Sequence, residues 1–510
     1  MGTPGNSAPF PELETAAIAS LQAAMTDGQL SARALVEMYL ARIEALDTNG
    51  PTIRAIIETN PDALSIADAL DTERAFTGSR GPLHGIPILL KDNIDTADRM
   101  NTTAGSLALL GARPQRDAFV AARLRAAGAI LLGKANMSEW ANFRSSHSSS
   151  GWSARGGQAL NPYALDRTPC GSSSGSASAV AASLAAASLG TETDGSILCP
   201  GAANGVVGIK PTVGLTSRAG VIPIAHSQDT VGPFGRTVAD AAALLNVIAG
   251  PDPRDPATAA SATRSITDYT QFLSKDALRG VRIGIPREVY FGYSEKTDAI
   301  IEAALETLTA LGAVLVDPAN IPTAKRMNES QSELEVLYYE FKANLNAYLS
   351  DLPGASVRSL EELIAFNTAH VEQEMPYFGQ ELLVASQAKG PLTDLSYLNA
   401  LEENQRLSRQ EGIDAVMEQH QLDALVMPTG APAWKIDLID GDHGLGGSSQ
   451  PAALAGYPAI SVPAGYTFGL PVGITFMGRA FSEPKLIALA YAFEQATQVR
   501  KPPRFVPSVP

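Results

Sequence analysis

Cysteine and histidine are scarce in this sequence of 510 residues, and their scarcity excludes two kinds of protein. The two cysteines, Cys170 and Cys199, cannot form the multi-disulfide framework of a small secreted domain. One bridge between them is conceivable, but free thiols are the default expectation. The six histidines are scattered, and no cluster of His, Cys and Asp has the spacing of metal ligands. We therefore expect neither a disulfide framework nor a metal centre.

Positive charge and long apolar runs are also missing. The 38 Lys and Arg residues against 53 Asp and Glu give a net charge of −15, which argues against nucleic acid or an anionic membrane as a partner. No run of about 20 apolar residues could span a membrane. Residues 1–20 lack the basic and apolar regions of a secretory signal. We expect a soluble protein that is cytoplasmic, or periplasmic or secreted if a signal has been removed; the oligomeric state stays open.

Glycine and serine, by contrast, are concentrated between residues 169 and 212. Two loops rich in both, residues 170–176 and 190–197, flank a run of Ala, Ser, Val and Leu at 177–189. Because that run has no polar face, we predict a buried helix of about four turns. Glycine lets backbones approach closely, and serine hydroxyls can donate, accept or attack. A flexible linker is the alternative, but linkers do not bracket a buried helix. The pattern indicates a functional site.

Helical and strand patterns alternate along most of the chain, which predicts an α/β protein with a parallel or mixed sheet and helices on both faces. One predicted strand, residues 86–90, is apolar throughout and ends on Lys91. From 325 to 420 helices dominate, and we predict a helical insertion within a single domain spanning 1–510. The predicted strands are 55–57, 86–90, 130–133, 281–285, 313–316, 425–427, 459–462 and 472–476; the predicted helices outside the centre are 15–25, 31–46, 61–75, 117–127, 237–248, 296–311, 332–349, 359–366, 381–387, 397–419 and 484–497.

Two familiar chemistries fit the central stretch poorly. Residues 171–175 match the G-x-S-x-G nucleophile elbow with Ser173 at its centre, but the preceding residues are polar and interrupted by proline instead of forming a buried strand. His443 could act as a base, yet a lone loop histidine is more often solvated. A phosphate site is also disfavoured, because no G-x-x-x-x-G-K-[ST] is present.

From about Glu14 to Thr497 the sequence resembles the amidase signature family. The resemblance rests jointly on five motifs, at residues 85–92, 170–175, 194–197, 208–212 and 469–473. Within the family, the bacterial peptide amidases are the most similar group, through residues 139–143, 151–158, 170–176, 190–197 and 378–383. The resemblance implies an α/β/α sandwich around a large mixed sheet.

The resemblance also implies a set of site residues. The family's nucleophile falls on Ser196, its bridging serine on Ser172 and its base on Lys91, with no cofactor. A lysine can be that base only when neutral, so its pKa must fall from about 10.4 towards roughly 7–8, which burial after an apolar strand can achieve. The oxyanion hole would be formed by the backbone amides of Thr193, Asp194, Gly195 and Ser196.

The expected activity is hydrolysis of carboxamides through an acyl-enzyme, most specifically of the C-terminal amide of peptides. The sequence departs from the family pattern at several positions. In the first loop Cys170 and Ser174 occupy outer positions that are usually glycine, and in the second loop Asp194 replaces the first glycine of the usual Gly-Gly-Ser. Leu198 replaces a frequent arginine, which removes an anchor for anionic substrates and argues against an amidotransferase subunit. Aryl amides, aliphatic amides or carbamates are the alternative substrates, and a non-catalytic binding protein is a third possibility.

Overall fold

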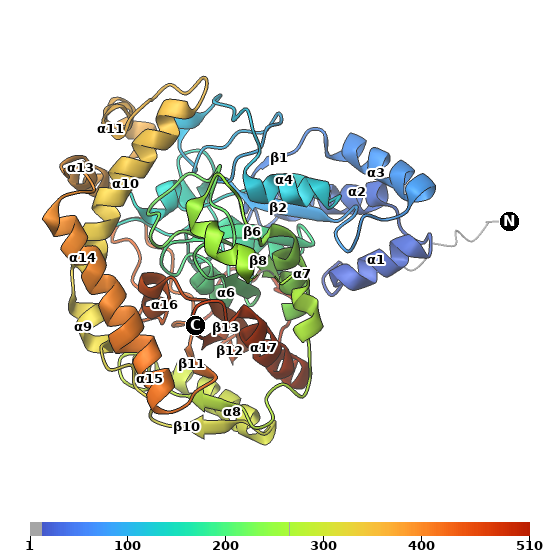
Figure 1. Ribbon diagram of the computed structural model, residues 1–510. Helices are drawn as coiled ribbons and strands as arrows, with labels where there is room; N and C mark the ends of the chain where they lie inside the picture. The colour runs from blue at the N-terminus through green and yellow to red at the C-terminus, as the bar shows by residue number, and fades with distance from the viewer. Residues whose placement is uncertain (1–12, 265) are drawn as a thin grey trace.

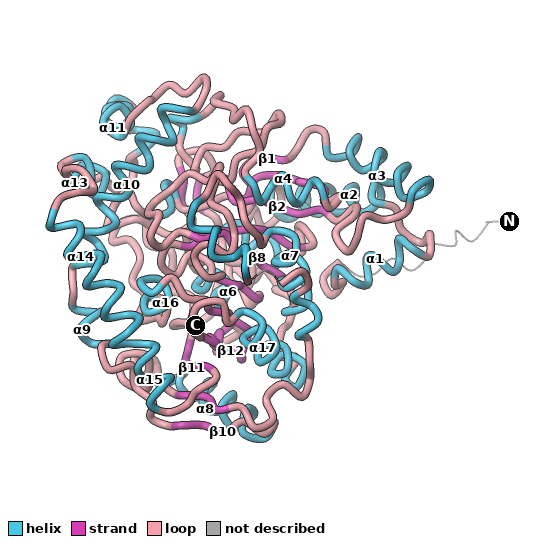
Figure 2. Tube along the Cα trace, in the orientation of Figure 1, coloured by secondary structure: helices cyan, strands magenta, loops and turns pink. Residues whose placement is uncertain are grey.

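An 11-stranded mixed sheet runs through the centre of the computed structural model, which describes residues 13–264 and 266–510 (Figures 1 and 2). Its strand order is β1-β3-β2-β6-β8-β7-β12-β13-β11-β9-β10. β2 pairs in parallel with both β3 and β6, whereas β8 and β12 pair antiparallel with their neighbours. The expected α/β fold around a large mixed sheet is confirmed. The first 12 residues, on which the expectation about a signal segment largely rests, lie outside the described part of the chain.

Each of the eight predicted strands overlaps a strand of the sheet, whereas β6, β7 and β8 were not predicted as strands. The bounds of the sheet's strands are β1 Ile56–Thr59, β2 Pro87–Lys91, β3 Ile130–Ala135, β6 Ala187–Glu192, β7 Val207–Lys210, β8 Thr230–Gly235, β9 Arg282–Gly284, β10 Val314–Val316, β11 Ala424–Pro428, β12 Ala459–Thr467 and β13 Leu470–Met477. A separate hairpin pairs β4 Trp152–Ser153 with β5 Gly157–Gln158. β2, β3 and β6 are buried along their whole length, as strands covered on both faces should be.

Helices cover the sheet and its edges. They are α1 Ile18–Thr26, α2 Ala32–Ile43, α3 Ala63–Thr77, α4 Phe119–Ala126, α5 Ser174–Ala181, α6 Leu198–Ala203, α7 Val238–Ile248, α8 Glu295–Ala310, α9 Ala324–Glu329, α10 Ser332–Asp351, α11 Leu360–Ala369, α12 Val371–Glu374, α13 Glu381–Gln387, α14 Leu395–Gln405, α15 Asp414–Gln419, α16 Gln450–Ala455 and α17 Glu483–Thr497. Side-chain caps fix several starts; the Ser31 hydroxyl, for example, accepts from the Ala34 amide at the start of α2.

Helices α9 to α15 form an arc along one side of the molecule, on the left in Figure 1. Apolar residues of α10, including Phe341 and Leu345, form a second core with Met137, Trp140 and Ile222 from the loops that follow the central strands. The helical region is therefore packed directly against loops at one edge of the sheet. The predicted helix 397–419 is interrupted, because residues Arg406–Ile413 form a π-helical segment between α14 and α15.

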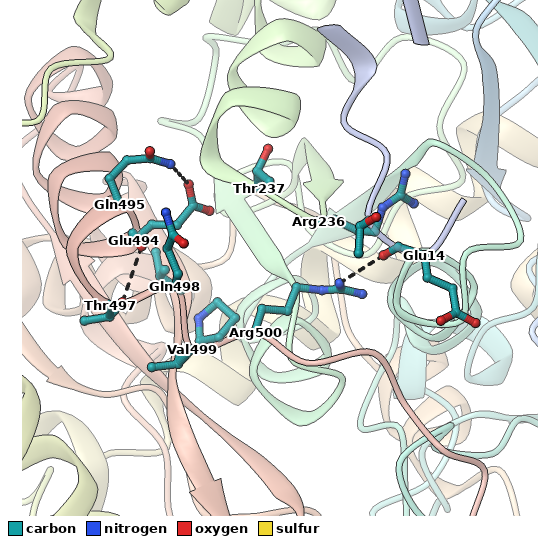
Figure 3. A pocket seen from close by; sticks show the side chains of 12 residues that line it. Glu14, Arg236, Thr237, Glu494, Gln495, Thr497, Gln498, Val499 and Arg500 are labelled. Atoms are coloured by element: carbon teal, nitrogen blue, oxygen red, sulfur yellow. Dashed lines mark hydrogen bonds between the residues drawn. The ribbon is translucent and has the colours of Figure 1, made fainter. Parts of the chain in front are cut away.

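Residues 14 and 15, before α1, and residues of the segment 494–500, at the end of α17 and after it, line one pocket (Figure 3). The guanidinium of Arg500 donates to the carbonyl of Glu14 at 3.4 Å and to that of Ala181 at 3.2 Å. Buried Arg236 donates to the carbonyls of Ala185 (2.9 Å) and Ala16 (2.5 Å). These charge-assisted bonds hold the segment before α1 and the segment after α17 onto the loop that leads into β6.

The predicted helix over residues 177–189 is wrong in its second half. The helix α5 ends at Ala181, and residues 187–192 form the central strand β6. A run of small apolar residues has no period that distinguishes a buried helix from a buried strand. Pairing with β2 on one side and β8 on the other decides the outcome.

The expectation of free thiols is also wrong. Cys170 and Cys199 form a disulfide with a Cα–Cα distance of 5.9 Å, which joins the first serine loop to the start of α6. The two cysteines are 29 residues apart in the sequence, across α5 and β6, so the chain between them gave no local indication of their proximity.

Removing this bridge should lower stability. Closing a loop of this length reduces the entropy of the unfolded chain by an amount worth roughly 3–4 kcal/mol, so we expect Cys170→Ser with Cys199→Ser to lower the free energy of unfolding by about that much. Denaturant titration measures the difference, and reduction of the unmodified protein is the control, because the chain has no other cysteine. Equal stability of the oxidised and reduced protein would contradict the prediction.

Candidate active site

Lys91 lies at the end of β2, between two parallel neighbours, and is fully buried. Its Nζ donates to the Ser172 hydroxyl at 2.7 Å, to the Thr191 hydroxyl at 2.9 Å and to the Thr191 carbonyl at 3.3 Å. These three acceptors match the three protons of an ammonium group. The strand therefore places the amine of Lys91 among polar groups, and the surrounding core shields it from water.

The first serine loop is attached to β6 by its own hydroxyls. Ser173 Oγ donates to the Thr191 carbonyl and Ser176 Oγ to the Leu189 carbonyl, both at 3.0 Å. Ser172 precedes them, after a cis peptide bond with Gly171. A Cβ on Gly175 would lie 2.1 Å from the carbonyl oxygen of Ala55, so only glycine allows this approach. Small residues thus fix Ser172 beside the strand.

The second loop brings Ser196 to the same point. The Ser172 hydroxyl donates to Ser196 Oγ at 3.0 Å, which completes a continuous chain of hydrogen bonds from Lys91 through Ser172 to Ser196. Lys91 and Ser172 are fully buried, whereas Ser196 is 7% exposed. The structure brings together all three residues predicted from the sequence, and Ser196 is the one among them that faces outward.

Residues 193–196 form a turn between β6 and α6. Just before it, Glu192 Oε2 accepts the amides of Ile197 at 2.6 Å and Leu198 at 2.9 Å. Among the described residues, no backbone hydrogen bond has the amide of residue 193, 194, 195 or 196 as its donor. Gly195 has φ of 78° and a Cβ there would lie 2.9 Å from Ser449 Oγ, so this position needs glycine. The turn is therefore held from both ends with its amides free to converge on an anion.

Burial governs the electrostatics of this centre. It lowers the pKa of Lys91 to about 7, while the nearby carboxylates of Asp229 and Glu192 act in the opposite direction. Burial also raises the pKa of Asp229 to about 6. Near neutral pH the amine of Lys91 is therefore present in both its neutral and its charged form.

Several residues around the centre were not predicted. Thr191 contacts the lysine, and Asp229 accepts the Thr193 hydroxyl at 2.6 Å together with the amides of Ile224 and Ala225, each at 2.9 Å. Thr191 lies in the predicted second loop, where its polar side chain was a usable signal. Asp229 is 33 positions beyond Ser196, and no motif marked it.

The rejected alternatives find no geometric support. The Ser173 hydroxyl donates to the Thr191 carbonyl of β6, and a ring nitrogen of His443 lies 3.1 Å from the carbonyl of Gly441. Leu198, at the position where the family often has an arginine, is buried in an apolar cluster with Tyr290 and Leu407. Across residues 13–264 and 266–510, His, Cys, Asp and Glu side chains do not gather in threes as metal ligands would, and no helix has the length and apolar character needed to cross a membrane.

Three of the segments that resemble the peptide amidases, 139–143, 151–158 and 378–383, lie close to the first serine loop. The buried guanidinium of Arg144 lies 5.1 Å from the ring centroid of Trp152 and 4.2 Å from that of Phe378, and it pairs with Glu139. Ser138, which comes directly before the first of these segments, donates its amide to the Ser172 carbonyl at 3.1 Å. Segments 139–143, 151–158 and 378–383 therefore pack as one unit next to the first serine loop.

Comparison with known proteins identifies the family. The Amidase family model matches residues 34–487. The structure of native peptide amidase from Stenotrophomonas maltophilia is 55% identical with a TM-score of 0.93, covering 98% of this chain and 100% of that one. A complex of the peptide amidase PAM with the competitive inhibitor chymostatin is 54% identical with a TM-score of 0.93, covering 96% of this chain and 99% of that one.

A curated relative gives the same result. A probable amidase of Arabidopsis thaliana is 46% identical over 503 residues, which cover 97% of this chain and 92% of the relative. With the family model matched over most of its length, this chain belongs to the amidase signature family of hydrolases.

Proposed function

We propose that Ser196 is the nucleophile, Ser172 the proton relay and Lys91 the general base of a serine hydrolase acting on carboxamides. The observation that carries this proposal is the unbroken chain of hydrogen bonds from Lys91 Nζ through Ser172 Oγ to Ser196 Oγ. A serine hydroxyl is a weak nucleophile until a neighbouring base takes its proton. A buried lysine whose pKa is near 7 can be that base at physiological pH.

The reaction follows from this geometry. With Lys91 neutral, the hydroxyl of Ser172 turns towards Nζ and that of Ser196 towards Ser172, so two protons shift by one place as Ser196 Oγ attacks the amide carbon. The oxyanion is held by the amides of the turn 193–196, each donor being worth about 3 kcal/mol. The relay then returns a proton to the amide nitrogen, ammonia leaves, and water releases the acid from the acyl-enzyme by the same steps.

The proposed substrate is the C-terminal carboxamide of peptides. Its support is the 55% identity to a peptide amidase over nearly the full length and the packing of the shared segments 139–143, 151–158 and 378–383 next to Ser172. A primary amide releases only NH₃, which a closed leaving-group pocket can accommodate, whereas an internal peptide bond needs room for a further chain. Buried Leu198 offers no cation to an anionic substrate. Other amides or carbamates are the alternative, since the Arabidopsis relative is named only as a probable amidase.

The nucleophile can be tested by substitution and covalent labelling. Ser196→Ala should abolish turnover and labelling by a fluorophosphonate probe, and Lys91→Ala should lower kcat by at least ~10²-fold. Ser172→Ala should be severe but leave a trace of activity. Ser178→Ala is the matched control, because this buried α5 hydroxyl bonds only the Ser174 carbonyl of its own helix. Near-normal kcat for Lys91→Ala at neutral pH would refute the lysine assignment.

The pH dependence tests the base independently. Since only neutral Lys91 accepts a proton, kcat/KM should rise with pH through an apparent pKa of about 7, the value burial gives Lys91. Asp229 raises the pKa of Lys91, so Asp229→Asn should move this rising limb to lower pH. If kcat/KM instead began to rise only near pH 10, close to the pKa of about 10.4 of free lysine, the base would not be a Lys91 with a lowered pKa.

Substrate choice can be read by mass spectrometry. A short peptide amide should release ammonia and shift to the mass of its acid, while the free acid stays unchanged. Internal fragments would indicate cleavage of peptide bonds. Activity confined to aryl or short aliphatic amides would reject the peptide substrate and leave the three proposed catalytic residues standing.

A further inference from the structure

The turn that carries the free amides is supported from outside the sheet by a second polar cluster. Gln228 lies in the loop before β8, is 2% exposed, and directs its side-chain amide to two acceptors, the Thr193 carbonyl at 3.4 Å and Glu333 Oε1 at 3.0 Å. Glu333 lies in the first turn of α10. Its other oxygen accepts the amide of Gln450, from the start of α16, at 3.0 Å. One glutamate therefore joins three segments that surround the turn.

The contact with Thr193 bears directly on the oxyanion hole. The carbonyl of Thr193 and the amide of Asp194 belong to one planar peptide unit and point in opposite directions. A donor that fixes the carbonyl therefore also fixes the direction of the Asp194 N–H, one of the proposed oxyanion donors. Gln228 supplies that donor, and Glu333 holds Gln228 in place.

Glu333 also contacts the turn through a side chain. The Asp194 carboxylate raises the pKa of the Glu333 carboxyl group, so the ionisation of the two groups is linked. Two neighbouring carboxylates repel each other unless one of them is protonated. A proton on one of the two carboxyl groups therefore favours the shape that the turn has here.

We infer that Glu333 is a positioning residue for the oxyanion turn: in its protonated form it orients Gln228 and through it the 193–194 peptide, and loss of its proton sets an alkaline limit to activity. The inference rests on the proposed function, because it assumes that these amides bind the oxyanion. When the proton leaves for solvent, the two negative charges separate and the Asp194 amide turns away from its target.

Burial and the Asp194 carboxylate raise the pKa of Glu333 to about 8, and burial also raises that of Asp194. The remaining charged or titratable neighbours of Asp194 are Lys210 on β7, Glu192 at the end of β6 and Tyr290. Burial lowers the pKa of Lys210 to about 8, so this lysine could titrate in the same range. The test must therefore separate Glu333 from Lys210.

Glu333→Gln makes this separation, because glutamine keeps a donor for Asp194 and an acceptor for Gln228 but cannot ionise. The pH profile of kcat/KM on a short peptide amide should fall above about pH 8 in the unmodified protein, and this fall should be absent in Glu333→Gln. Glu335→Gln on the same helix, which loses a pair with Lys389, is the matched control and should keep the wild-type profile. Glu333→Ala should lower kcat about tenfold with little change in KM, less than the ~10²–10³-fold for losing an oxyanion donor outright.

A second variant gives a directional check that does not depend on how Glu333→Gln folds. The Gln450 amide favours the ionised form of Glu333, so Gln450→Leu should move the alkaline fall to higher pH. An unchanged fall in both variants, as titration of Lys210 would give, or no fall between pH 7 and 10 in the unmodified protein, would overturn the inference. The rate of fluorophosphonate labelling at Ser196, followed in parallel, reports the same profile even if peptide amides are not the substrate. Absence of labelling would instead reject the proposed nucleophile.

Discussion

The burial of one amine, that of Lys91, is the constraint on which the rest of the site depends. Lowering its pKa from 10.5 to about 7 corresponds to roughly 5 kcal/mol of disfavoured charge. An exposed strand end could not impose this, because water would solvate the ammonium group. β2 lies between β3 and β6 and is buried along its whole length, so the sheet itself keeps the amine out of water.

Small side chains are the consequence of placing two serine loops next to such an amine. For Ser172 and Ser196 to lie within hydrogen-bond distance of one another, α5 must approach β6 more closely than large residues permit. Ser173 and Ser176 use this closeness, because their hydroxyls satisfy carbonyls of β6 while filling little volume. A Cβ on Gly190 would lie 2.6 Å from the ring of Phe234, so the strand is as constrained as the helix. The abundance of glycine and serine in this stretch is therefore a packing requirement as much as a chemical one.

The sequence predicted which three residues form the hydrogen-bonded chain, but it predicted few of the residues around them. Lys91, Ser172 and Ser196 were identifiable because each lies in a short motif, and the α/β class followed from the alternation of patterns. The helix over 177–189 was overextended because a small-residue run carries no period, and the disulfide was missed because nothing local ties Cys170 to Cys199. Asp229 and Glu333 gave no signal, since a single acidic residue in a loop or helix is most often solvated.

This difference reflects how the site is assembled. The groups of the hydrogen-bonded chain come from β2 and from the two loops that bracket α5 and β6, where motif spacing and fold coincide. The groups that orient and surround them come from 228–229, 333 and 449–450, and the wall next to Ser172 from 139–158 and 378. The positions of Glu333 and Gln450 depend on how α10 packs against the loops that follow the central strands and α16 against the sheet, which is a tertiary property. The hydrogen-bonded chain built on β2 and on the loops bracketing α5 and β6 can therefore stay fixed. On the proposed mechanism, the helical region α9 to α15 and the outer loops would then determine which amide reaches Ser196 and over what range of pH it is turned over.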